Sequence, residues 1–199
     1  MGVAKALLRD AHGVSLLERA VTALHDGGCE HVVVVLGARA DEVSLTRRGD
    51  VSVVVADDWA TGMGASMRAG LDACAQIAPD AGVAVITLVD VPDVDARVIT
   101  RVLRESESGG PDALARATFD ARPGHPVVIG RTHWAVAHAV ATGDRGARGL
   151  FATRPHHLVE CGDLASGADV DTPADLRRFD AMPPATATPL VTGEDRRHA

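Results

Sequence analysis

Short continuous apolar runs alternate along the chain with longer segments in which apolar residues recur at helical spacing. The longest of the apolar runs covers residues 83–92 and includes Asp90 near its end. A run this apolar, rich in β-branched residues, is typical of a strand covered on both faces, as in a parallel sheet. The pattern therefore predicts a buried strand from residue 83 that ends at Asp90, and open α/β sheets bind their ligands at the carboxyl ends of such strands.

The other segments predict further strands and helices in alternation. The predicted strands are 32–36, 51–55, 113–118, 127–129 and 157–161, and the predicted helices are 14–25, 41–48, 65–76, 95–105, 133–141, 147–152 and 172–179. Ser15 and Glu18 have the spacing of a capping box at the first of these helices. Alternating strands and helices predict parallel βαβ units in a layered α/β domain.

The length of 199 residues suits one domain, which we expect to cover residues 1–182. Residues 183–199 mix Pro, Thr, Ala and charged residues without periodicity and predict a disordered tail. We expect no membrane span, because no run of 18 apolar residues occurs. The three cysteines lack CxxC spacing, so neither zinc nor a disulfide is expected, and a reducing cytoplasm fits.

Composition and charge narrow the classes of function. The net charge is -7, aromatic residues make up 3% and Tyr is absent. This composition argues against a nucleic-acid partner, because such surfaces use positive charge and aromatic platforms. An acidic protein that handles phosphates would instead need a divalent cation or a local cluster of Arg and Lys.

Carboxylates occur in two stretches that could hold such a cation. Asp90 follows the longest apolar run, and Asp169 and Asp171 stand just before the helix predicted from residue 172. Carboxylate oxygens suit Mg²⁺, which usually also binds substrate phosphates. The alternative for both stretches is structural, since Asp and Thr before a proline favour a helix start. Together, Asp90 and Asp171 could bridge one metal ion.

Small residues gather at 59–70, where Thr61, Gly62, Gly64 and Ser66 open a predicted helix. Backbone N–H groups at such a helix start can bind an anion or let a nucleotide approach closely. The segment lacks the GxxxxGK[ST] pattern of a P-loop. An ordinary loop with a helix cap is therefore the alternative.

Basic side chains and one histidine could contact phosphate groups. His125 stands between Gly124 and a proline, which fixes its position; it could donate to a phosphate or be a satisfied core residue. Arg145 and Arg148 carry forked donors suited to phosphate, or they lie on a solvated helix start. Lys5 could be a point charge on a phosphate or a plain surface lysine.

Taken in order, these segments resemble the molybdenum-cofactor nucleotidyltransferase family with its MobA-like NTP transferase domain, and more closely its cytidylyltransferase branch. The resemblance extends from residue 1 to about 180. It implies a Rossmann-like, doubly wound α/β fold with a mostly parallel sheet. The segments that carry it are 1–8, 59–70, 88–92, 123–127, 143–147 and 169–176.

The resemblance implies an enzyme that moves a nucleoside monophosphate, CMP from CTP, to a molybdopterin-type phosphorylated acceptor and releases pyrophosphate. A molybdoenzyme is a further partner that it implies. Mg²⁺ would be held by Asp90 and Asp171, and Lys5 would contact the triphosphate. The remaining implied contacts are Thr61, Gly62, Gly64 and Ser66 for nucleotide or acceptor, and Gly124 and His125 for the acceptor.

One departure from the family keeps other functions open. The family begins with a buried central strand and a Gly-rich loop for the triphosphate, and this sequence starts after both. Losing that strand would leave backbone groups unpaired on both neighbouring strands. Either about twenty residues precede residue 1, or the sequence is a fragment, or the neighbouring strands have closed up. We therefore expect weak nucleotide binding. The alternatives are transfer to another phosphorylated small molecule and a non-catalytic subunit that binds or inserts molybdenum cofactor.

Overall fold

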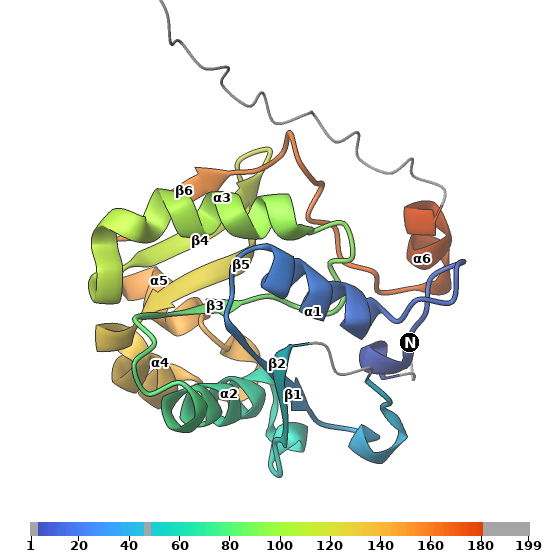
Figure 1. The fold of residues 1–199 in the computed structure, drawn as a ribbon, viewed down its shortest axis with the longest axis horizontal. Helices are drawn as coiled ribbons and strands as arrows, with labels where there is room; N and C mark the ends of the chain where they lie inside the picture. Colours follow the sequence, from blue (N-terminus) through green and yellow to red (C-terminus); the bar gives the residue numbers. More distant parts are fainter. Residues whose placement is uncertain (1–3, 46–48, 181–199) are drawn as a thin grey trace, which may run out of the picture.

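A computed structural model of the protein describes residues 4–45 and 49–180, which form an α/β fold in three layers (Figure 1). The predicted tail over 183–199 lies outside the described residues, as do residues 46–48 of the helix predicted over 41–48. The strands are β1 (His31–Leu36), β2 (Asp50–Val55), β3 (Val83–Ile86), β4 (Leu114–Phe119), β5 (Arg122–Gly130) and β6 (His157–Glu160). The α-helices are α1 (Leu16–Asp26), α2 (Met63–Ile77), α3 (Ala96–Ser106), α4 (Trp134–Val140), α5 (Arg148–Thr153) and α6 (Pro173–Asp180).

The strands form two separate sheets. One contains β1 and β2, which run parallel, and the other has the order β3–β5–β4–β6. In the larger sheet β4 and β6 are parallel, while β5 runs antiparallel to both of its neighbours. The predicted α/β fold with parallel strands is confirmed, but the sheet is divided between β1 and β3.

Helices cover both faces of these sheets. On one face, α1 packs on β1 and α3 packs on the larger sheet. On the other face lie α2, α4 and α5 (Figure 1). Gly27, which ends α1, allows α1 and α3 to touch, because a Cβ there would lie 2.5 Å from Ile99. The hydroxyl of Ser15 accepts from the backbone N–H groups of Leu17 and Glu18, so the predicted helix start is confirmed.

The central apolar run differs from its prediction. The hydrogen-bonded strand β3 stops at Ile86 rather than at Asp90, and only Ala84 of its four residues is buried. Among the described residues, β3 pairs with β5 alone, and its last pair is Ile86 with Val127. The next residue of β5 is Pro126, which has no N–H to donate, so the ladder ends there. Asp90 consequently lies in a turn, four residues beyond the strand.

Two shorter segments also differ from their predictions. The helix expected over 41–48 is a single 3₁₀ turn, η2 (Ala40–Glu42). The segment 122–126, expected as a connection between two strands, belongs to β5 itself. Asp120 and Ala121, both with positive φ, form the tight turn that joins β4 to β5.

No helix among residues 4–45 and 49–180 is long and apolar enough to cross a membrane. Cys29, Cys74 and Cys161 are all free thiols. The expectation of no disulfide among these cysteines therefore agrees with the structure.

Candidate active site

Lys5 joins two carboxylates that stand far apart in the sequence. Its Nζ donates to Asp90 Oδ2 at 2.5 Å and to Asp171 Oδ1 at 2.6 Å. Lys5 begins the 3₁₀ turn η1 (Lys5–Leu7), which leads into α1 through a hydrogen bond from Leu16 N–H to the Leu8 carbonyl. The structure thus brings together the three residues predicted to hold the metal and the triphosphate.

The backbone fixes the two acidic segments to one another. Val170 N–H donates to the Asp90 carbonyl at 2.7 Å, and the Val170 side chain is buried. Asp169 and Asp171 therefore flank an anchored residue beside the turn that carries Asp90. This arrangement does not follow from local sequence, because it depends on a contact across 80 positions of the chain.

One oxygen of Asp90 is free for a ligand. Asp90 Oδ1 is buried and has no hydrogen-bond partner among the described residues, and the same holds for the hydroxyl of nearby Thr87. A buried carboxylate oxygen without a donor is costly, so a cation at this position would lower the free energy of the site. The carboxylate chemistry of Asp90 and Asp171 fits a hard divalent ion.

Protein atoms alone do not complete a coordination shell in the described part of the chain. No group of three or more His, Cys, Asp or Glu side chains there has metal-holding geometry. Magnesium commonly uses one or two carboxylates and takes its remaining ligands from water and substrate phosphates. The two carboxylates therefore suit an ion that arrives with a nucleotide better than a permanently enclosed one.

The charges of the cluster shift two of its pKa values. Burial favours neutral Lys5, but hydrogen bonds and charges from Asp171 and Asp90 outweigh it and raise the lysine pKa above its usual value. Burial, followed by the charges of Asp90 and Asp171, raises the pKa of Asp169. Lys5 is thus firmly cationic, and it already neutralises part of the negative charge that a metal ion would otherwise meet.

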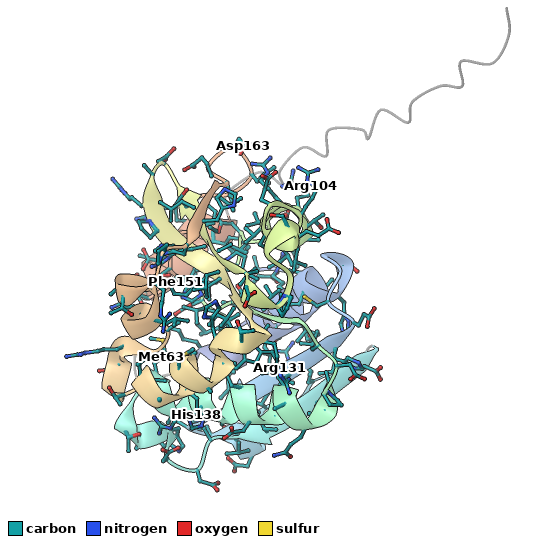
Figure 2. The ribbon with its side chains drawn as sticks, turned by 90° about the vertical axis from the view of Figure 1, so that its left-hand side faces the viewer. Met63, Arg104, Arg131, His138, Phe151 and Asp163 are labelled. Atoms are coloured by element: carbon teal, nitrogen blue, oxygen red, sulfur yellow. The ribbon has the colours of Figure 1, made fainter. Side chains whose placement is uncertain are left out.

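A cavity of about 730 Å³ lies between the two sheets and extends to their carboxyl edge. Its inner part is apolar and is lined by β1, β3, α1 and α2. Its polar part includes Asp169 together with three arginines, Arg116, Arg145 and Arg148. Figure 2 views the molecule from the side of α4 and α5 and labels Met63 and Phe151, which also line the cavity.

His125 lines the same cavity. Its Nδ1 lies 3.2 Å from the Ile86 carbonyl oxygen, which can only accept, so Nδ1 carries the proton. Burial, helped by the charges of Arg116 and Arg148, lowers the pKa of His125 below its usual 6.5. The neutral ring then keeps Nε2 as an acceptor. In this tautomer Nε2 would donate to a phosphate only after the ring takes up a proton, and the predicted contact of His125 with the acceptor stays a prediction.

The glycines predicted for nucleotide approach also lie in close contact with other backbone. A Cβ on Gly62 would lie 2.5 Å from the Gly143 backbone, and one on Gly64 would lie 2.6 Å from the Ala141 carbonyl oxygen. The start of α2 therefore packs tightly on residues 141–144. Thr61 uses its hydroxyl within its own turn, on the Asp58 carbonyl. Of the four predicted contacts in this loop, only Ser66 lines the cavity.

Gly124, the last predicted contact, lines the cavity beside His125. A Cβ at Gly124 would lie 2.8 Å from the Phe119 ring, and the Gly124 carbonyl accepts from Arg116 Nε at 3.2 Å. Arg116 was missed by the sequence reasoning. In the sequence, Arg116 is a single charged residue within a predicted strand. Its two neighbours along the chain, Ala115 and Ala117, are fully buried in the structure.

Asp169 links the two sets of charged groups: besides burial, Asp90, Asp171, Lys5 and Arg148 all act on its pKa, and Arg116, Arg145 and Arg148 line the cavity with it. Phosphoryl-type transfer depends on such positioning and charge neutralisation more than on covalent help from the protein. The class of protein that the fold and site define is therefore a nucleotidyltransferase-type domain.

The family is shown by comparison with known proteins. A model of the family described as the MobA-like NTP transferase domain matches residues 1–159, and the chain belongs to this family. This match confirms the resemblance to the family that the order of the sequence motifs indicated. A curated relative, the nicotine blue oxidoreductase of Paenarthrobacter nicotinovorans, is 35% identical over 182 residues, covering 88% of this chain and 87% of the relative.

Solved structures agree with this assignment. Rv0371c from Mycobacterium tuberculosis H37Rv is 27% identical with a TM-score of 0.67, covering 90% of both chains. Its manganese complex is 26% identical with a TM-score of 0.66, covering 89% of this chain and 92% of the other. The molybdopterin-guanine dinucleotide biosynthesis protein A of Archaeoglobus fulgidus shares the fold, with 18% identity, a TM-score of 0.60 and 90% of both chains covered.

Proposed function

We propose that this protein is a metal-dependent nucleotidyltransferase that moves CMP from CTP to the phosphate of a molybdopterin-type acceptor. The observation that carries the proposal is the placement of Lys5 between Asp90 and Asp171, with a second Asp90 oxygen buried and unpartnered. Family membership supports nucleotidyl transfer, and the order of the motifs supports the cytidylyl branch. The three free thiols favour a reducing compartment, the cytoplasm.

The reaction needs no general base from the protein. An oxygen of the acceptor phosphate, already anionic, forms a bond to the α-phosphorus of the nucleotide. The bond from that phosphorus to the bridging oxygen breaks, and the electron pair leaves with pyrophosphate. A divalent ion held by Asp90 and Asp171 would supply positive charge at the α-phosphate, and we favour Mg²⁺ as the commonest partner of nucleotides.

The chain's own residues bind and orient the reactants. Lys5 would leave the carboxylates when the cation arrives and carry its charge to the β- and γ-phosphates. Arg116, Arg145 and Arg148 would hold the acceptor phosphate in the polar part of the cavity. His125, with Nε2 as an acceptor, would take a hydrogen bond from an N–H or O–H of the acceptor and so select its orientation.

The experiment that tests the proposal is a panel of nucleotides. Pyrophosphate release is measured with CTP, GTP, ATP or UTP, each with magnesium and with molybdopterin or another phosphorylated acceptor. We expect release only when an acceptor is present, fastest with CTP and molybdopterin. Preference for another base or acceptor would move the assignment to another branch, and no release with any pair would contradict transfer. A molybdoenzyme partner is tested separately, by co-purification with its cofactor-loaded form.

A second candidate rests on the curated relative. Because that protein is named an oxidoreductase of nicotine blue, redox turnover of nicotine blue is the corresponding activity for this chain. The two candidates separate cleanly, since one consumes a nucleoside triphosphate and the other changes the oxidation state of nicotine blue. Assaying both reactions on one preparation, with and without Asp90→Asn, shows which of them depends on the carboxylate cluster.

A further inference from the structure

One arginine joins two segments that lead into the candidate active site. Arg19, near the start of α1, donates from Nε to Asp10 Oδ2 at 2.7 Å and from Nη2 to the same oxygen. The same guanidinium group lies over the Phe179 ring of α6, with its central carbon 5.4 Å from the ring centre. A cation this close to the face of an aromatic ring is attracted by the ring. Arg19 thus holds α6 beside the N-terminal part of the chain, apart from the larger sheet (Figure 1).

Asp10 belongs to the loop that follows Lys5. Its carboxyl group is buried, and Oδ1 accepts from two backbone N–H groups of the same loop, both at 2.9 Å. Between Lys5 and Asp10, the Leu8 N–H donates to the Lys5 carbonyl at 3.1 Å, so the turn that carries Lys5 runs directly into this loop. The ion pair with Arg19 fastens the loop to α1 and thereby restrains the backbone that carries Lys5.

The helix that Arg19 contacts begins two positions after Asp171. Thr172 and Asp175 cap it reciprocally: Thr172 N–H donates to Asp175 Oδ2 at 2.9 Å, and Asp175 N–H donates to Thr172 Oγ1 at 3.2 Å. This cap ties the direction of α6 to the backbone next to Asp171. None of the described residues of α6 belongs to a hydrophobic cluster, so buried packing does not hold the helix in place. The contact of Phe179 with Arg19 therefore holds its far end.

The side chain of Asp171 depends on this support. It is 67% exposed, and its Oδ1 accepts from Lys5 at 2.6 Å. The hydrogen bond from Val170 N–H to the Asp90 carbonyl fixes the backbone on one flank of Asp171, and α6 fixes the other flank. With only one flank fixed, an exposed side chain would be free to turn away from Lys5 into solvent.

We propose that Arg19 is a positioning residue for the cation site: by holding α6 to the loop that follows Lys5, it keeps Asp171 next to Asp90. Arg19 is not among the described residues that line the cavity, so it acts through the placement of Asp171. The inference rests on the proposed function only in taking Asp90 and Asp171 as the ligands of the cation.

Phe179→Leu is the variant that tests this role. It removes the aromatic face but leaves the ion pair of Arg19 with Asp10 in place, whereas Arg19→Gln would leave a buried carboxylate unpaired and destabilise the whole fold. Phe179→Trp keeps an aromatic face for the guanidinium group and should behave like the unmodified protein. Arg177→Gln, at an exposed position of the same helix, is the matched control.

Lys5 reports on Asp171 directly, because it is the only lysine in the sequence. Its amine reacts with an acylating reagent only when it leaves the carboxylates, and mass spectrometry separates it from the N-terminal amine. We expect Phe179→Leu to raise the rate of Lys5 acylation about threefold and to weaken Mn²⁺ binding without nucleotide by a similar factor, as the loss of one exposed cation–π contact implies. In the Asp171→Asn background, the same change should leave the Lys5 rate unaltered, because the carboxylate that α6 positions is already gone.

Three results would overturn the positioning role. The first is a Lys5 acylation rate in Phe179→Leu equal to that in the Arg177→Gln control. The second is a rate in Phe179→Trp as high as in Phe179→Leu. The third is an equal rise in the Asp171→Asn background, which would show that the ring acts on the stability of the fold in general. Absence of Mn²⁺ binding, or of pyrophosphate release with every nucleotide, would contradict the proposed function, and the Lys5 rates would still test the role of Arg19.

Discussion

The two sheets are built from similar residues but differ in how well they are packed. In β5, Val127, Val128 and Ile129 are at most 1% exposed, whereas in β2 Val53 and Val55 are 39% and 50% exposed. Both segments read as Val-rich strands in the sequence. The difference comes from neighbours, because β5 lies between two strands and two helix layers, while β2 is an edge and β1 faces the cavity. A hydrophobic run shows which side chains a strand can bury, whereas the neighbouring strands and helices determine which of them are buried.

The candidate active site lies where these two regions meet. Lys5 leads into α1, which covers the two-stranded sheet of β1 and β2. Asp90 follows β3 of the four-stranded sheet. Any change in how the two sheets are joined would therefore alter the cluster of Lys5, Asp90 and Asp171. Substitutions on the two sides should separate the contributions of the two sheets.

Asp90→Asn should reduce nucleotidyl transfer by at least about 10³-fold, because it weakens the carboxylate pair that would hold the cation, and the positive charge of that cation would stabilise the negative charge at the α-phosphate. The unfolding midpoint should change little, since the amide keeps the shape of the side chain. The control is Asp163→Asn, which alters a well-exposed carboxylate paired with Arg101 on the packed side. Steady-state rates within threefold of the unmodified protein in Asp90→Asn would remove Asp90 from the mechanism.

A pair of matched truncations measures the packing difference itself. Val128→Ala should destabilise the protein by about 2 kcal/mol, because Val128 is fully buried and leaves a cavity. Val33→Ala should cost less than about 1 kcal/mol, since Val33 is only half-buried beside the open space. Denaturant unfolding measures both. Equal costs for the two truncations would show that the space beside Val33 is already filled.

Lys5→Met should separate metal binding from nucleotide binding. Without the ammonium group, the two carboxylates are free for the cation, and we expect Mn²⁺ affinity without nucleotide to rise by about 10-fold. Affinity for the magnesium nucleotide should fall by a similar factor, because the lysine charge that would contact the triphosphate is lost. Calorimetric titration measures both, with the exposed Arg9→Met as the control. Unchanged Mn²⁺ affinity would mean that Lys5 does not compete for the carboxylates.

The smallest effect concerns the pH dependence of His125. Burial lowers the pKa of the His125 ring. In the folded protein the ring therefore stays neutral at pH values at which the same ring in the unfolded chain takes up a proton. The unfolded state then binds more protons, so stability falls as pH drops below about 6.5. His125→Gln should flatten that decline in denaturant unfolding between pH 6.5 and 5. A slope identical to that of the unmodified protein would show that His125 is not the titrating group.

Much of the fold was predictable because its elements follow local rules. The cap at Ser15, the helical spacing of α3 and the strands β1 and β2 were all recognised from sequence. That Asp90 and Asp171 lie close together was also predicted. The pairing between strands was not: β3 ends where its partner β5 reaches Pro126, and no pattern within β3 itself records which strand lies beside it.

The candidate site divides in the same way. Lys5, Asp90 and Asp171 were predicted and lie together. Asp90 and Asp171 stand at predicted element boundaries, whereas Lys5 was predicted only from the resemblance to the family. Arg116 was missed because a single charge in a strand is usually a solvent-facing residue, and here it faces the cavity. For Gly62 and Gly64 the nucleotide contact stays a prediction, because a small residue looks the same in a sequence whether a ligand or the protein's own backbone approaches it, and the structure shows a backbone approach at both.

That ambiguity at the start of α2 bears on how mutational surveys of this protein would be interpreted. Any side chain at Gly62 or Gly64 must displace the backbone of residues 141–144, whatever molecule is bound. Saturation mutagenesis would therefore report both positions as intolerant even in a screen that selects for folding alone. Intolerance there would record how closely two backbone segments approach each other, and it would carry no information about substrate choice.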